Sequence, residues 1–220
     1  KDYCQETRQL IHAFHILQND YRKLMDYVEF HNDNGNTFSH RIYELLLRTC
    51  TEFENNCRGI LIDNNYLPNR ANLNILDYFK INKASKLNEY SVKIKNWFPD
   101  SIEIKPFEEW NSEQFKPLFW YKAYNNVKHN RSENFHDANL INLTYALSGL
   151  LIILTSQFDR NVFTQFQEWS MSSSSEDGYQ STQNSIFSFK YPTWLDSDKV
   201  EHIGDDLLAN DNIQFSIYDF

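Results

Sequence analysis

The segment from Leu140 to Phe158 constrains the fold of this chain more than any other stretch. Its large apolar residues recur at steps of three and four, the spacing of one helix face: Leu140, Leu143, Leu147, Leu151, Leu154 and Phe158. Isoleucine and tyrosine residues fill much of the remaining surface, and a helix that is apolar on most sides is buried on most sides. We therefore expect it to be the central element, with Ser148 and Gly149 allowing a neighbour to approach closely.

The same segment is too short and too interrupted to be a membrane span. Its apolar run from Leu140 to Leu154 is about 15 residues long and contains Asn142, Thr144 and Ser148. A helix needs ~20 largely apolar residues to cross a bilayer. The sequence thus predicts a core helix and no membrane association.

Helical periodicity also predicts the elements that cover this segment. Residues 3–30 and 39–62 each carry one apolar stripe, with Ser39 as a helix cap and the turn-forming sequence HNDNGNT between the two helices. A short link of this kind makes two helices antiparallel neighbours. Residues 73–79 predict a short helix, and Pro117 suits the first turn of another that ends near residue 130. The expected fold is mainly α, an up-and-down helical bundle.

Between about residues 88 and 107 the pattern changes from helical to alternating. Tyr90, Val92 and Ile94 alternate with polar residues, and Ile102 and Ile104 do so again after a turn at 98–101. Strict alternation is typical of a half-buried strand. The sequence predicts a small β-hairpin insertion, which must pack on a helix or pair with another strand because a lone hairpin is marginal in water.

Composition divides the chain into three parts. Residues 1–165 form the expected bundle with its β insertion, the serine-rich residues 166–184 are expected to be a flexible linker, and residues 185–220 form an acidic C-terminal arm. The arm contains short strand-like pieces at 185–191 and 213–218, with a short helix or loop at 197–209 between them.

Most of the net charge of −9 comes from this tail. From Glu168 onward there are ten carboxylates against Lys190 and Lys199. We expect the arm to dock, because it is too small for its own core: it either covers a basic cluster in the bundle or pairs a strand with the 88–107 hairpin. A strongly acidic average also argues against a protein that coats nucleic acid non-specifically.

The cysteines and short motifs exclude several kinds of site. Cys4, Cys50 and Cys57 form no CxxC pair, so they are expected to be free thiols of a cytoplasmic protein. No metal-binding spacing, glycine-rich phosphate loop or serine or cysteine nucleophile elbow appears. We expect neither a metal nor a cofactor.

A basic cluster lies just before the central helix. Between Glu113 and Glu133 the charged side chains are all positive: Lys116, Lys122, Lys128 and Arg131. On the helix that begins at Pro117, the residues expected to face inward are Trp120, Ala123, Tyr124 and Val127, and those expected on the other face are Tyr121, Asn125, Lys128 and His129. This cluster can contact phosphates, with tyrosines for stacking. The structural alternative is a solvated helix face on which Asn125 and His129 brace neighbouring helices.

His136 has its own chemical argument. Ser132 or Asn134 can cap the central helix. If Asn134 does so, His136 lies in the first turn, where the helix dipole lowers an imidazole pKa and free N–H groups bind phosphate. Arg131 is close enough in sequence to contact the same anion. Cleavage of RNA needs a base for the 2′-hydroxyl, an acid for the 5′-oxygen and a cation for the phosphorane charge, and these two residue types supply all three.

The sequence RSENFH, from Arg131 to His136 and directly before the last core helix, resembles the signature of the HEPN superfamily (higher eukaryotes and prokaryotes nucleotide-binding), an arginine followed after four to six residues by histidine. The segment WYKAYNNVKHNR also resembles a block of uncharacterised bacterial HEPN-like proteins, and the resemblance covers about residues 1–165. It implies a helical bundle that dimerises to place two motifs in one cleft. Many members are metal-independent endoribonucleases of toxin–antitoxin and anti-phage systems, whereas others have lost catalysis.

Two other matches to this signature are present. Arg8 and His15 fit it on a helix that looks structural. A frequent form of the motif, Arg-Asn with His four residues after the Asn, fits Asn125 and His129, but Tyr124 then stands where the arginine belongs.

The resemblance implies an RNA-cleaving homodimer with a possible antitoxin or defence-system partner. Its expected catalytic residues are Arg131, His136 and His129, and its expected RNA contacts are Asn125, Asn126, Lys128, Lys122 and Tyr124. The alternative is a non-catalytic HEPN-like module for dimerisation or for binding a partner protein or nucleotide.

Overall fold

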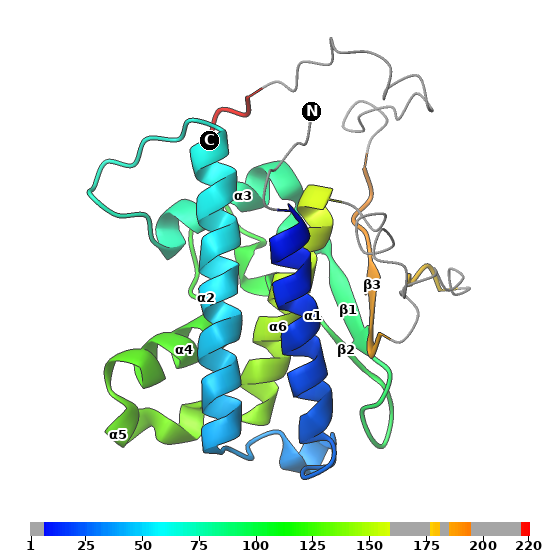
Figure 1. Cartoon of the computed structure of the whole chain (residues 1–220). Helices are drawn as coiled ribbons and strands as arrows, with labels where there is room; N and C mark the ends of the chain where they lie inside the picture. Colours follow the sequence, from blue (N-terminus) through cyan, green and yellow to red (C-terminus); the bar gives the residue numbers. More distant parts are fainter. Residues whose placement is uncertain (1–6, 159–176, 181–184, 195–216) are drawn as a thin grey trace.

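The chain folds into a helical bundle with a small antiparallel sheet on one side (Figure 1). The computed structural model describes residues 7–158, 177–180, 185–194 and 217–220. The main helices are α1 (Thr7–Leu24), α2 (His40–Asp63), α3 (Ile75–Ser85), α4 (Phe119–His129) and α6 (Leu140–Phe158). A mainly α bundle with a β insertion is therefore confirmed within these residues.

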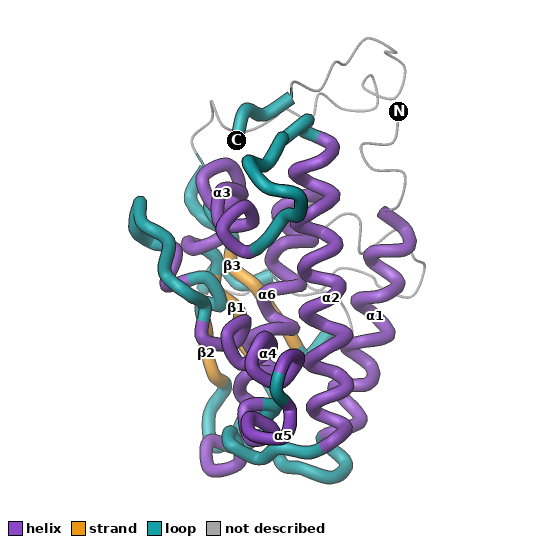
Figure 2. Tube along the Cα trace, turned by 90° about the vertical axis from the view of Figure 1, so that its left-hand side faces the viewer, coloured by secondary structure: helices purple, strands orange, loops and turns teal. Residues whose placement is uncertain are grey.

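Helix α6 is the central element, as its apolar pattern predicted. Fifteen of its 19 residues are buried, and Figure 2 shows it surrounded by α1, α2, α4 and the sheet. By length and composition alone it passes as a membrane span, but 78% of its most apolar window is buried inside the protein. A Cβ on Gly149 would lie 3.1 Å from Cζ2 of Trp120, so the expected close approach of a neighbour takes place here.

Helix α1 runs opposite to both α2 and α6. Helices α1 and α2 are antiparallel, and the loop between them lies at the lower end in Figure 1. Helix α6 begins at that end, where the amide of Leu140 donates to the carbonyl of Thr37 at 2.9 Å. Near the opposite end, Nε2 of Gln157 donates to Oδ1 of Asn56 at 3.3 Å, so α2 and α6 are parallel. A buried hydrogen bond of 2.6 Å between Tyr21 and Thr144 joins α1 to α6.

Helix α1 ends at Leu24, six residues before the expected boundary at residue 30. The chain leaves the helix because Phe30 packs in the core against Tyr21 and Trp97, at ring distances of 4.7 and 5.9 Å. Its carbonyl accepts a hydrogen bond from the amide of Phe98. Helix α2 begins where the sequence predicted, because the Ser39 hydroxyl accepts from the amide of Ile42.

Helix α3 is longer than the 73–79 helix expected from periodicity. Asn74 and Asp77 form a reciprocal capping box at its start, and Lys86 ends it in a left-handed conformation with φ 48°. Three short 3-10 helices in this half of the chain are η1 (Asn32–Asn34), η2 (Leu87–Glu89) and η3 (Glu108–Trp110).

The sheet has the strand order β2-β1-β3. Strands β1 (Ser91–Ile94) and β2 (Ile102–Ile104) form the expected hairpin, with Val92 opposite Ile104. Strand β3 (Phe187–Lys190) comes from the tail and pairs antiparallel with β1, with Val92 opposite Phe189. Of the two dockings expected for the arm, pairing with the hairpin is the one observed.

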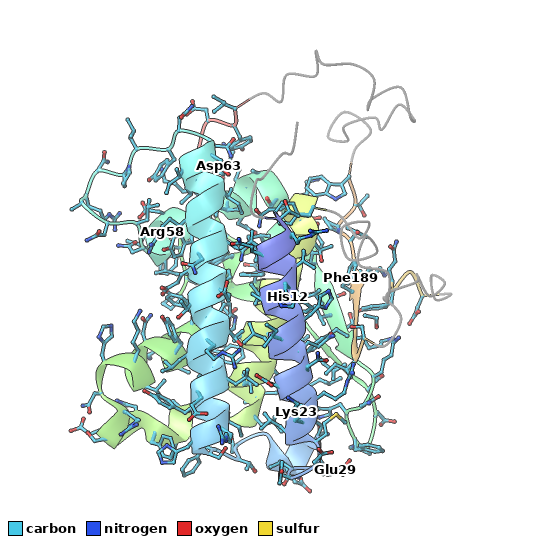
Figure 3. All side chains as sticks on the ribbon, in the orientation of Figure 1. His12, Lys23, Glu29, Arg58, Asp63 and Phe189 are labelled. Atoms are coloured by element: carbon cyan, nitrogen blue, oxygen red, sulfur yellow. The ribbon has the colours of Figure 1, made fainter. Side chains whose placement is uncertain are left out.

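Strand β3 contributes side chains to the core of the bundle. Phe187 is fully buried and stacks on Tyr21 at a ring distance of 5.7 Å, and Phe189, labelled in Figure 3, is also buried. Of the expected linker 166–184, only 177–180 are described; the expected 197–209 element and residues 213–216 of the last strand-like piece lie outside the described residues, and 217–220 are irregular. Strand β3 of the arm is therefore part of the core of the bundle.

Candidate functional site

The expected catalytic residues lie on the short connection between α4 and α6, at the end of the bundle that also holds the α1–α2 loop, and the expected RNA contacts lie on α4 itself (Figures 1 and 2). Two short elements form this connection: α5 (Arg131–Asn134) and the 3-10 helix η4 (Phe135–Asp137). We call residues 129–137 the α4–α6 turn. The side chain of Asn126 donates to Oδ2 of Asp137 at 2.8 Å and so holds the end of α4 against the turn.

The expected cap of the central helix is wrong, and with it the electrostatic argument for His136. The Ser132 hydroxyl and the Asn134 amide both bond back to Asn130 and cap nothing in α6. Asn139 caps α6, since its Oδ1 accepts a hydrogen bond from the amide of Asn142 at 3.0 Å. His136 therefore lies in the three-residue η4, outside the first turn of α6, and the dipole of α6 does not act on it directly.

The three expected catalytic side chains are all exposed on the turn. Arg131 lies over the ring of Tyr43, 5.5 Å from its centroid, and Nε2 of His136 lies 3.4 Å from Oδ1 of Asp137. His129 is exposed at the last position of α4. In the part of the chain that the structure describes, no hydrogen bond joins any two of these three side chains, so one copy does not assemble them into a catalytic group.

Tyr124 is a structural residue and not an RNA contact. It is buried, with 1% of its surface exposed. Lys128 Nζ donates to its hydroxyl at 2.8 Å and lies 4.8 Å from its ring centroid. The expectation that Tyr124 stacks on a base is therefore wrong, because the ring is buried and Lys128 lies over it.

The neighbouring residue Tyr121, expected on the outer face of α4, is also buried. Its hydroxyl donates to Oε1 of Glu54 on α2 at 2.7 Å, and Lys128 Nζ lies 3.8 Å from the same oxygen. Sequence reasoning missed Glu54, and no local signal points to it, since it is 67 residues from Tyr121 in the chain. These contacts join α2 to α4.

Burial and charge shift the pKa values within this group. Burial and the Glu54 carboxylate raise the pKa of the Tyr121 hydroxyl, so it remains a hydrogen-bond donor. Burial raises the pKa of Tyr124 as well. For Lys128, burial acts to lower the pKa, but the Tyr124 hydrogen bond and the Glu54 charge together raise it. Lys128 stays charged and is already paired, so it is a weaker phosphate ligand than its sequence position indicates.

The remaining expected RNA contacts differ in their availability. Lys122 is exposed on α4, Asn125 is half-buried, and Asn126 is engaged with Asp137. The structure therefore leaves Lys122 and Asn125 as the accessible members of that set.

The second match to the arginine–histidine signature lies on the structural helix α1. His15 is partly buried beside Phe14, with ring centroids 6.0 Å apart. Burial, and secondarily the neighbouring His12, lowers the pKa of His15 to about 4. An imidazole that stays neutral inside the bundle is part of the packing.

The His15 shift predicts a loss of stability in mild acid. The unfolded chain protonates His15 near pH 6.5, whereas the folded chain does so near pH 4. Unfolding therefore takes up a proton between these values, and the free energy of unfolding falls as the pH falls through that window. After a discount for partial exposure, we expect His15 to account for about 2 kcal/mol of that loss.

Urea unfolding of wild type and His15→Gln at pH 7 and pH 4.5 measures this. The difference in free energy of unfolding between the two pH values should shrink in His15→Gln. The control His12→Gln removes the exposed histidine one turn away. It should keep most of the difference in free energy of unfolding between the two pH values, because burial is the larger cause of the lowered pKa of His15. Equal slopes for wild type and His15→Gln would contradict the assignment.

Within the described residues, no group of three or more histidine, cysteine or acidic side chains could hold a metal ion. Cys50 and Cys57 are buried free thiols, and burial raises the pKa of both. Neither is a reactive nucleophile. Cys4 lies outside the described residues.

The chain matches no protein-family model, no curated protein and no solved structure. Its own residues are therefore the whole basis for assigning a function.

Proposed function

We propose that this chain is a metal-independent, HEPN-like endoribonuclease of a bacterial toxin or anti-phage defence system, acting in the cytoplasm as a homodimer. One observation carries the proposal. Arg131, His136 and His129 are all exposed on one nine-residue turn, and no described carboxylate pairs with Arg131. An arginine and two histidines are sufficient for cleavage of RNA without a metal.

Each residue has a defined role in this proposal. One histidine removes the proton from the 2′-hydroxyl, and the 2′-oxygen attacks the phosphorus. The other histidine protonates the departing 5′-oxygen, which leaves a 2′,3′-cyclic phosphate and a 5′-hydroxyl end. Arg131 stabilises the phosphorane charge, and Lys122 and Asn125 contact the flanking phosphates.

The proposed dimer follows from the same geometry. In one copy the three side chains face solvent and are not hydrogen-bonded to one another. Efficient acid–base chemistry needs groups held within hydrogen-bond reach of the reacting atoms. A second copy that presents its own turn across a two-fold axis would enclose the phosphate between two arginines and two pairs of histidines.

The second candidate is a non-catalytic HEPN-like module that dimerises or holds a partner protein, such as an antitoxin. The observation that favours it is the burial of Tyr124. In the Asn125–His129 form of the motif this tyrosine replaces the catalytic arginine. The cation beside it, Lys128, is already bonded to the Tyr124 hydroxyl and paired with Glu54.

A cleavage assay separates the two candidates. Purified protein is incubated with end-labelled single-stranded and structured RNAs in the presence of EDTA, and its oligomeric state is measured by light scattering. The nuclease predicts cyclic-phosphate ends that accumulate despite EDTA. If the dimeric protein leaves every RNA intact, the non-catalytic module is the better assignment; cleavage that EDTA abolishes would overturn the metal-independent mechanism.

A further inference from the structure

A group of four rings, two exposed and two half-buried, lies beside Arg131 and has no part in the proposed chemistry. We call it the aromatic patch: Phe38, His40, Tyr43 and Phe135. Phe135 is at its centre, with ring distances of 5.4 Å to Phe38, 4.7 Å to His40 and 6.1 Å to Tyr43. Phe38 is 47% exposed and contacts the Phe135 ring, so it belongs to a group of rings, whereas a singly exposed apolar side chain would be ordinary.

The backbone holds the patch in a fixed position. The carbonyls of Gly35 and Thr37 accept hydrogen bonds from the amides of Ile141 and Leu140, each at 2.9 Å. Phe38 forms an isolated antiparallel bridge with Asn139. The loop that carries Phe38 is thus tied to the first turn of the central helix, so a ligand that contacts Phe38 does not have to order this loop.

The charges around the patch are mixed but leave one cation accessible. Arg41 is paired with Glu44 at 2.9 Å, and Glu133 accepts a hydrogen bond from Asn130 at 2.7 Å. Arg131 stacks on Tyr43 with an exposed guanidinium. The patch therefore places the exposed rings of Phe38 and His40 near a guanidinium, a group suited to binding phosphate.

We propose that the aromatic patch binds the bases of single-stranded RNA while Arg131 contacts the adjoining phosphate. This inference rests on the proposed function for the identity of the ligand and adds the class of substrate to it. Aromatic side chains stack on bases of any sequence, but only where the bases are unpaired and exposed. A continuous duplex hides its base faces and is a poor ligand for such a surface.

The test measures the contribution of the bases apart from that of the phosphates. The probes are a fluorescent 2′-O-methyl oligouridine, which lacks the 2′-hydroxyl needed for cleavage, an abasic oligomer of equal length, and a duplex. Wild-type protein is expected to bind the oligouridine about tenfold more tightly than the abasic oligomer or the duplex. Phe38→Ala should remove most of this difference, and Phe38→Trp should retain it.

The matched control is Phe119→Ala, which removes an equally large, 40% exposed ring from the first position of α4, away from the turn. It should leave the difference between oligouridine and abasic oligomer unchanged. Light scattering on each variant tests whether a second copy of the chain, and not RNA, covers the patch. If Phe38→Ala converts a dimer into a monomer, the patch is an interface between copies and the inference is overturned.

Failure of the base-binding role of the aromatic patch can be distinguished from failure of the proposed nuclease function. Base-dependent binding that Phe38→Ala abolishes, in a protein that cleaves no RNA, supports the patch and removes the nuclease. Cleavage that depends on Arg131, with equal affinity for oligouridine and abasic oligomer, keeps the nuclease and overturns the patch.

Discussion

Replacing Arg131 by alanine is expected to lower the rate of RNA cleavage by about 10²–10³-fold while the fold is retained, because loss of one transition-state donor costs this much in other enzymes. The side chain is exposed and contacts the Tyr43 ring, so its removal leaves no buried group unsatisfied. His136→Ala should lower the rate by about 10²–10⁴-fold through loss of a proton-transfer group. Single-turnover rates on a labelled RNA, with EDTA present, measure both effects.

The control for this experiment is Arg41→Ala. Arg41 is another exposed arginine at the same end of the bundle, but it is paired with Glu44. Its loss should change the cleavage rate less than about threefold, because rim charges affect encounter more than chemistry. Arg131→Lys keeps the charge but not the bidentate fork, so an intermediate rate is expected.

His129→Ala distinguishes the two forms of the motif. If His129 is the second proton-transfer group, its loss should match that of His136 in size. Rates unchanged in the Arg131, His136 and His129 variants would place the activity elsewhere and overturn the site.

Replacing Phe187 by alanine is expected to lower the free energy of unfolding by about 3–5 kcal/mol, the usual cost of deleting a buried aromatic ring. The ring is fully buried, stacks on Tyr21 and lies on β3, which pairs with β1 along four residues. Denaturant unfolding followed by tryptophan fluorescence measures the change. The loss would be large for a residue that lies beyond the serine-rich segment of the chain.

Lys190→Ala is the matched control on the same strand. Its side chain is exposed, so the free energy of unfolding should change by less than about 0.5 kcal/mol. If Phe187→Ala also costs less than about 1 kcal/mol, the tail strand does not belong to the cooperative unit, and the division into a bundle and a separate arm would stand.

Several parts of this fold could be predicted from local pattern. The spacing of leucines identified α6, and Ser39 marked the start of α2 within one residue. The change to an alternating pattern identified the β1–β2 hairpin. In each case the information lies within a few neighbouring residues, because a helix or strand face is defined by its own repeat.

The details of the site could be predicted less well from the sequence. The sequence offered Ser132 and Asn134 as caps of α6, whereas in the structure the amide of Asn142 donates to the side chain of Asn139, which is the cap. Tyr121 and Tyr124 were assigned to opposite faces, yet both are buried, because the Glu54 side chain of α2 accepts the polar end of Tyr121. Periodicity on one helix carries no information about the partner that faces it.

The sequence by itself determined two local properties. These are the central helix and the basic residues on the turn directly before it. Only the tertiary structure decided that Arg131 is exposed, that Tyr121 is buried, and that a strand from the tail completes the sheet. Each of these depends on contacts between segments far apart in the chain. Such contacts are chosen by the shape and polarity of the opposing surface, which no single stretch of sequence contains.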